Sequence, residues 1–70
     1  MKPEIAMSGN LRMKAARALR ALTQRKLAAL VGTRESEISR IETGRVIPSQ
    51  DLKGRIATAL GKATFEIFDY

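Results

Sequence analysis

The feature that most constrains this chain is a pair of short helical patterns with little more than Gly32 between them. The first pattern covers residues 24–31 and follows Thr23, whose hydroxyl can cap the start of a helix. The second pattern covers about residues 34–42. Glycine at the junction tolerates the positive φ at which a helix ends. Two helices joined by so few residues must cross steeply, so the sequence predicts a helix-turn-helix.

Three further segments carry helical patterns, which makes the expected fold all-α. They are residues 10–21 after a cap at Ser8 or Asn10, the segment from Ser49 to Leu60, and residues 65–68 after a cap at Thr64. A chain of 70 residues forms one domain. We expect that domain at residues 9–70, and residues 1–8 as an N-terminal arm where disorder would concentrate. The residues expected to face the core are Leu11, Ala15, Ala18, Leu22, Leu27, Ala28, Val31, Ile38, Ile41, Leu52, Ile56, Ala57, Leu60, Phe65 and Phe68.

The composition excludes several classes of function. The sequence has no cysteine and no histidine, which rules out disulfides and a Cys/His metal site. Its seven carboxylates are scattered and suggest no acid–base pair, so we expect neither an enzyme nor a cofactor. No apolar run approaches the roughly 20 residues of a membrane span, and the start lacks the apolar stretch of a secretory signal. The expectation is a cytoplasmic protein without a membrane partner.

Positive charge is concentrated in the first half of the chain. The net charge is +6, and residues 1–34 carry eight Lys/Arg and one acid, whereas residues 35–70 carry five Lys/Arg and six acids. Such segregation favours a surface that meets a polyanion. From charge alone three alternatives stay open: a nucleic acid, a membrane surface, or a basic face that only keeps the protein soluble.

The second helix of the pair has an apolar and a polar side. Ile38 and Ile41 would anchor it in the domain. Arginine can pair with guanine, glutamate can accept from the cytosine amino group, and serine can bond several bases. We therefore expect this helix to lie in the major groove of duplex DNA. Because phosphates repel acids, Glu35 either reads a base from the helix start, stabilises the helix dipole there, or pairs with a neighbouring Arg. The polar side consists of Arg34, Glu35, Ser36, Glu37, Ser39 and Arg40.

Several short motifs occur together at a characteristic spacing. They are Thr23-Gln24-x-x-Leu27-Ala28, Gly32, Ile38-Ser39-Arg40-Ile41-Glu42-x-Gly44, Pro48 and Leu60-Gly61. Over about residues 10–68 the chain resembles the lambda-repressor-like, or Cro/C1-type (XRE), helix-turn-helix family. The resemblance implies a compact five-helix fold and sequence-specific binding of double-stranded DNA, usually as a homodimer on a palindromic site.

The resemblance also implies roles for individual residues. Arg17 and Glu42 match a structural ion pair of the family, and loss of one partner of such a buried pair would cost ~3–5 kcal/mol. The family usually has Ser or Thr at the capping position where this chain has Arg34, so Thr33 is an alternative cap that would shift the register by one residue. The implied DNA contacts are Glu35, Ser36 and Arg40 to bases, and Gln24, Arg34, Ser39 and Arg45 to phosphates.

Three functions are compatible with this reading. The leading prediction is a DNA-binding transcriptional regulator. The second is an antitoxin that uses the same module and binds a toxin through an apolar cluster near the C-terminus. The third is a module of this fold that binds only other proteins, which predicts no salt-sensitive binding of DNA. The antitoxin cluster would comprise Phe65, Ile67, Phe68 and Tyr70.

Overall fold

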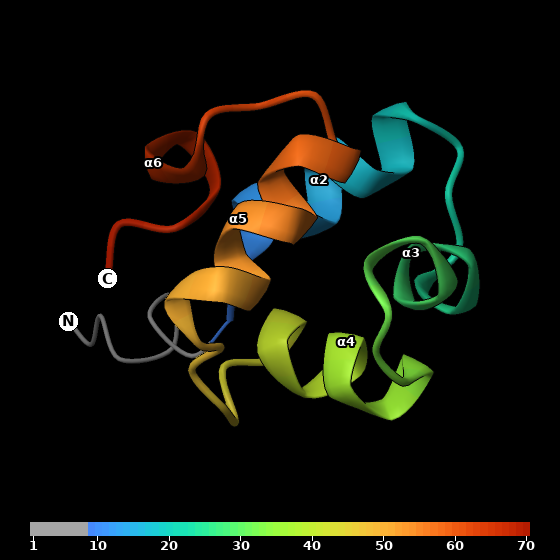
Figure 1. Cartoon of the computed structure of the whole chain (residues 1–70), viewed down its shortest axis with the longest axis horizontal. Coiled ribbons are helices and arrows are strands. Elements are labelled where there is room, and N and C mark those ends of the chain that lie inside the picture. The colour runs from blue at the N-terminus through green and yellow to red at the C-terminus, as the bar shows by residue number, and fades with distance from the viewer. Residues whose placement is uncertain (1–8) are drawn as a thin grey trace, which may run out of the picture.

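The structure is a computed structural model that describes residues 9–70. Over this range the chain has five helices and no strand, which confirms the all-α prediction (Figure 1). The predicted arm at residues 1–8 lies outside the described residues. In chain order the helices are α2 (Leu11–Leu19), α3 (Gln24–Val31), α4 (Glu35–Glu42), α5 (Gln50–Ala59) and α6 (Thr64–Ile67).

The helices are arranged around α5. Figure 1 shows α5 across the middle of the domain in front of α2, with the α3–α4 pair on one side and α6 on the other. Helix α3 packs against both α4 and α5, and α2 packs against both α4 and α6. The α3–α4 pair is therefore supported by α5, which packs against α3, and by α2, which packs against α4.

Side-chain caps determine where three of the helices begin. Asn10 Oδ1 accepts from the amide three residues on at 2.9 Å, at the start of α2. Thr23 Oγ1 does the same at 3.0 Å for α3, and Ser49 Oγ at 3.1 Å for α5. The predicted caps Thr23 and Ser49 are confirmed, and Asn10 is the cap of α2.

Helices α4 and α6 begin without a hydrogen bond from the side chain of the N-cap residue. The N-cap of α4 is Arg34 rather than Thr33, and it makes no side-chain cap bond, so the register of the predicted 34–42 segment is kept. Helix α6 begins at Thr64, after Ala63 as N-cap, so the prediction that Thr64 caps it is wrong. The Glu66 carboxylate accepts from the Ala63 amide at 2.7 Å and stabilises this start instead.

The turn between α3 and α4 is closed by glycine and by an arginine from another helix. Gly32 has a φ of 78°, in the left-handed region that favours glycine. The Thr33 amide donates to the Ala28 carbonyl at 2.9 Å, which ends α3. Arg55 of α5 donates through Nη1 to the Val31 carbonyl at 2.7 Å. The junction of α3 and α4 is therefore stabilised by a backbone hydrogen bond within the turn and by the Arg55 side chain from α5.

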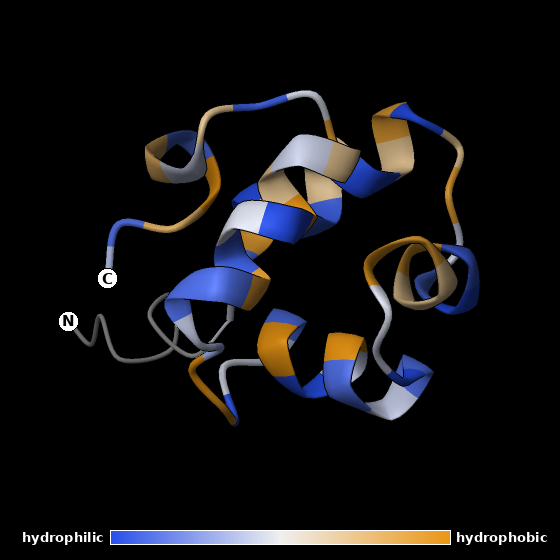
Figure 2. Cartoon of the chain, viewed as in Figure 1, coloured by the Kyte–Doolittle hydropathy of each residue, from blue (hydrophilic) through white to orange (hydrophobic). Residues whose placement is uncertain are grey.

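One apolar core joins all five helices. Figure 2 shows the apolar residues of α4 on its side toward the rest of the domain, while its far side is polar. Every residue predicted to face inward on α3, α4 and α5 is buried. The buried apolar residues are Met13, Ala16, Leu27, Ala28, Val31, Ile38, Ile41, Leu52, Ile56, Ala57, Leu60, Ile67 and Phe68.

The predicted inward face of α2 is wrong. Leu11 is 69% exposed and Ala15 and Ala18 are also exposed, whereas Met13 and Ala16 are buried. Leu22 is half-buried and packs against the core from the loop after α2. Arg17 lies four residues after Met13 and one residue after Ala16, so it is on the buried side of α2. Because Arg17 must face α4 to reach Glu42, this side of α2 turns inward.

The last helix also differs from the prediction at one aromatic residue. Phe68 is buried, as predicted, but Phe65 is 75% exposed, so its assignment to the core is wrong. Because α6 begins one residue early and ends at Ile67, the residues that turn inward are Ile67 and Phe68, with 2% and 4% of their surface exposed.

Candidate nucleic-acid interface

The outward side of α4 is polar and open to solvent. Ser36 and Arg40 are exposed and lie one turn apart, and the half-buried Ser39 lies next to Arg40 on the same side. On the opposite side Ile38 and Ile41 have no exposed surface. The structure therefore brings two predicted base contacts and one predicted phosphate contact to one surface, which nothing in the described part of the chain covers.

Charged residues occupy the first turn of α4. Arg34 and Glu35 are exposed, and Glu37 is half-buried at the edge of the polar side. Glu35 is the first residue of the helix, where the helix dipole favours a carboxylate. Its exposure also leaves the carboxylate accessible to a donor on a base.

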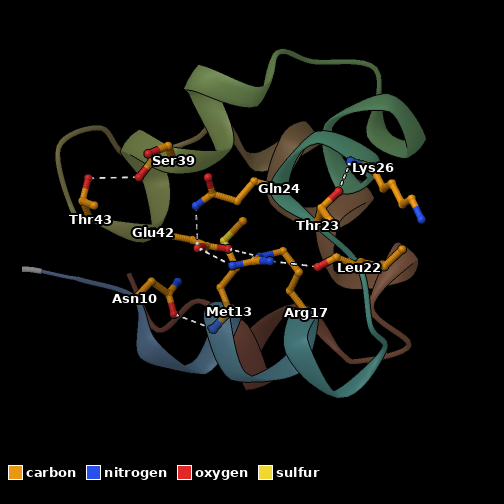
Figure 3. Close-up of polar contacts among 10 residues, drawn as sticks. All are labelled: Asn10, Met13, Arg17, Leu22, Thr23, Gln24, Lys26, Ser39, Glu42 and Thr43. Atoms are coloured by element: carbon orange, nitrogen blue, oxygen red, sulfur yellow. Dashed lines mark hydrogen bonds and ion pairs between the residues drawn. The ribbon is translucent and has the colours of Figure 1, made fainter.

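A bidentate ion pair joins α2 to the end of α4. Arg17 donates to Glu42 through Nε at 2.6 Å and through Nη2 at 3.1 Å, and the two side chains are 14% and 4% exposed (Figure 3). Arg17 Nη1 also donates at 2.8 Å to the carbonyl of Leu22, two residues before α3 begins. The resemblance implied that Arg17 and Glu42 interact, and the structure contains the pair. One guanidinium thus ties the start of α3 to the end of α4.

Arg17 of this pair remains charged at any ordinary pH. The hydrogen bond with Glu42 raises the pKa of Arg17 above its usual value, and this outweighs the lowering that burial alone would cause. A raised pKa of a cationic group contributes stability that is complete below the pKa of the unfolded chain and is lost only in strong alkali. The position of α4 is therefore insensitive to pH, as far as this arginine is concerned.

Gln24 extends the same network to the start of α3. Its Nε2 donates to Glu42 Oε1 at 3.0 Å, and Figure 3 shows the amide turned toward the Arg17–Glu42 pair. Sequence reasoning assigned Gln24 to a DNA phosphate and missed this bond. A primary amide nitrogen carries two hydrogens, so the bond to Glu42 leaves the second one available.

The loop after α4 supplies a further cation. Arg45 is exposed, and its amide donates to the Arg40 carbonyl at 2.8 Å, which holds the loop against the helix end. Thr43 caps the same end, because its hydroxyl donates to the Ser39 carbonyl at 3.0 Å (Figure 3). Thr43 lies one turn beyond Ser39 and Arg40 on the polar side.

The described residues show no sign of a metal centre or a membrane span. Within residues 9–70 no three His, Cys, Asp or Glu side chains come close enough to hold a metal ion. None of the five helices has the length and apolar character needed to cross a bilayer.

Comparisons with known proteins agree with this geometry. A family model described as helix-turn-helix matches residues 13–67. The chain is similar to the restriction-modification controller protein C.AhdI from Aeromonas hydrophila, with 30% identity over 84% of this chain and 89% of that chain and a TM-score of 0.79. It is also similar to the clp gene regulator ClgR from Corynebacterium glutamicum, with 26% identity, 83% and 62% coverage and a TM-score of 0.78. A search of curated proteins finds no match.

Proposed function

The chain belongs to the Cro/C1-type helix-turn-helix family of DNA-binding regulators, and from this we propose that it is a transcriptional regulator that reads a specific duplex sequence. The observation that carries the proposal is the outward side of α4, which is polar, exposed and anchored by two fully buried isoleucines. A helix presented in this way can enter the major groove while α3 braces it.

Sequence is read, in this proposal, by three side chains of α4. Arg40 pairs with a guanine, Ser36 bonds a neighbouring base, and Glu35 accepts from the amino group of a cytosine. The support for these roles is their exposure and, for Ser36 and Arg40, their position one turn apart. Glu35 reaches a base from the helix start, where it is exposed.

Phosphates are held, in this proposal, on both sides of the groove. Gln24 uses its second amide hydrogen at the start of α3, where the helix dipole also favours an anion. Arg34 and Ser39 contact phosphates along α4, and Arg45 does so from the loop after it. These contacts supply affinity and register without reading sequence.

We further propose that the protein binds a palindromic operator as a homodimer. A domain of this size buries a small core, so pairing adds stability, and a palindrome doubles the number of phosphate contacts. The similarity to a restriction-modification controller favours control of genes over the antitoxin role. A module that binds only proteins is the remaining alternative, and the following experiment separates it from a regulator.

The test is selection of bound duplexes from a random pool at about 50 mM and about 200 mM salt, using the wild-type protein and Arg40→Ala. Enrichment of one palindrome by the wild type, and loss of one position of that motif with Arg40→Ala, are the expected results. Binding without any enriched motif would contradict sequence reading. Failure to bind duplex even at the lower salt concentration would contradict the proposed function as a whole.

A further inference from the structure

The side of α2 that faces solvent is apolar. We call Leu11, Ala15, Ala18 and Leu19 the α2 stripe. All four are exposed, with Leu11 at 69% and Leu19 at 84% of their surface. Their spacing is that of one helical face, and the helix is only nine residues long, so the stripe covers its whole length. Scattered exposed leucines are common in small proteins, but a helical face made only of apolar residues marks a contact surface.

The α2 stripe faces away from the proposed DNA surface. Met13, Ala16 and Arg17 form the opposite side of the helix, and Arg17 reaches from there to Glu42 at the end of α4. A partner bound to the stripe therefore leaves the polar side of α4 accessible. The protein can therefore hold a partner on the α2 stripe and DNA on α4 at the same time.

Leu19 stands between two shallow hollows that a partner can fill. One, of about 510 Å³, lies between α2 and the end of α5 and is bordered by Leu60 and Lys62. The other, of about 240 Å³, lies between α2 and α6 and is bordered by Ala15 and Ile67. A raised leucine with a depression on each side matches the ridges and grooves by which helices pack.

The charges around the stripe select the kind of partner. Helix α2 contains no acid, and Arg12 and Lys14 flank the stripe on its two sides. Lys62 borders both hollows. Two acids lie nearby and both have partners: Asp69 pairs with Arg12 at 3.6 Å, and Glu66, which borders the smaller hollow, accepts from the Ala63 amide at 2.7 Å. Two copies that paired through α2 would bring these cations together, which is unfavourable, whereas acids flanking an apolar helix would pair with them.

We propose that the α2 stripe is a docking surface for another protein, which presents an amphipathic helix with apolar side chains flanked by Asp or Glu. The apolar side chains of that helix lie over Ala15 and Ala18 between the two leucines, and its acids meet Arg12, Lys14 and Lys62. A partner held there is brought to a DNA site without competing for it.

The test uses a displayed library of helical peptides, with the full-length protein as bait. Selection enriches peptides with apolar residues at i, i+3 or i+4, and i+7 and with Asp or Glu beside them. The double variant Leu11→Ser/Leu19→Ser binds the enriched peptide at least about tenfold more weakly by fluorescence anisotropy. Leu30→Ser is the matched control, because Leu30 is 64% exposed on α3, and it binds within about twofold of wild type.

Several outcomes would overturn the proposal. Equal binding of the enriched peptide to the double variant places the contact elsewhere, and enrichment of basic peptides, or of none, removes the charge argument. Sedimentation of the same variants identifies a second copy as the occupant if Leu11→Ser/Leu19→Ser lowers self-association and Leu30→Ser does not. Circular dichroism melts confirm that both variants are folded, since serine at an exposed position leaves the core intact.

Discussion

At the scale of single residues, Glu42 is the most connected side chain near the proposed DNA surface. Its carboxylate accepts from Arg17 and Gln24, and its backbone carbonyl accepts from the Asn10 amide at 2.8 Å. Gly9 lies so close that an added Cβ would be 2.9 Å from the same carbonyl oxygen. The start of α2, its Arg17 and the start of α3 therefore all contact the last residue of α4, which is at least 18 residues away from each of them in sequence. The loop that carries Arg45 begins directly after this residue.

Replacing Arg17 with methionine should lower the free energy of unfolding by about 3–5 kcal/mol, because it leaves the buried Glu42 carboxylate without its main partner. Urea denaturation followed by circular dichroism measures this loss. Arg12→Met is the control, since the Arg12–Asp69 pair is 58% and 67% exposed and should contribute less than about 1 kcal/mol. Similar losses in the two variants would show that the buried pair has no special role.

Replacing Arg40 with alanine should weaken binding to the selected operator by about 1–3 kcal/mol per half-site and relax the preference at one base pair. Fluorescence anisotropy with the operator and with single-base variants of it measures both effects. Arg12→Ala removes the same charge from the outer side of α2 and should leave the base preference unchanged. A uniform loss over all duplexes would reassign Arg40 to a phosphate.

At the scale of elements, the α3–α4 turn determines how the DNA-facing helix is presented. Gly32 supplies the left-handed backbone that ends α3, and Arg55 from α5 bonds the last carbonyl of that helix. Arg55 also pairs with Asp51 at 2.9 Å on its own helix, which keeps the guanidinium over the turn. The arrangement of α3 and α4 thus depends on the backbone conformation of Gly32 and on the side chain of Arg55 from α5.

Two glycine-to-alanine changes should have opposite effects. Gly32→Ala should destabilise the domain by about 1–2 kcal/mol, because alanine is strained at a φ of 78° and its Cβ would lie 3.3 Å from Arg55 Nη1. Gly54→Ala should stabilise it by about 0.5–1 kcal/mol, because Gly54 is inside α5 and a Cβ there meets nothing within 4 Å. Thermal unfolding of the two variants measures the difference, and a shift of the same sign in both would refute this explanation.

At the scale of the whole molecule, the two ends of the described chain are fastened to each other. Asn10 Nδ2 donates to the Ile67 carbonyl at 3.1 Å and to the Tyr70 hydroxyl at 3.2 Å. Lys53 of α5 is 3% exposed, donates to the Tyr70 carbonyl, and lies 4.9 Å from the centre of the Tyr70 ring. Residues near both termini thereby close the end of the core that faces away from the α3–α4 turn.

Replacing Asn10 with alanine should destabilise the domain by about 2–3 kcal/mol, because it removes the cap of α2 together with both bonds to the C-terminal segment. Thr23→Ala removes only an exposed cap and should cost about 1 kcal/mol. Denaturant titrations of both variants compare the two. Equal losses would mean that the link between the chain ends adds no stability.

The salt dependence of DNA binding should report the number of subunits on one site. Each neutralised phosphate contributes about −0.9 to the slope of log K against log salt concentration, so Arg45→Ala should flatten the slope by about two for a dimer and by about one for a monomer. Anisotropy titrations of the operator over a range of salt concentrations give the slope. An unchanged slope would exclude Arg45 as a phosphate contact.

The positions of the helices and the composition of most of the core could be predicted from local patterns. A cap is a bond to the amide three residues on, as at Thr23 and Ser49, and a glycine ends a helix through its own backbone, so both are properties of a few consecutive residues. The two isoleucines of α4 lie three residues apart with polar residues around them, which determined its buried and exposed sides before any packing was known.

The tertiary structure alone decided the rotation of α2 and the partner of Gln24. The sequence of α2 offers two apolar faces, and the one that is buried is the one that carries Arg17 to a carboxylate 25 residues away. Gln24 likewise meets Glu42 because α3 and α4 cross at Gly32. Such choices depend on the energies of contacts between distant segments, which no local sequence pattern contains. The tertiary structure was therefore needed to show which apolar face of α2 stays exposed to solvent.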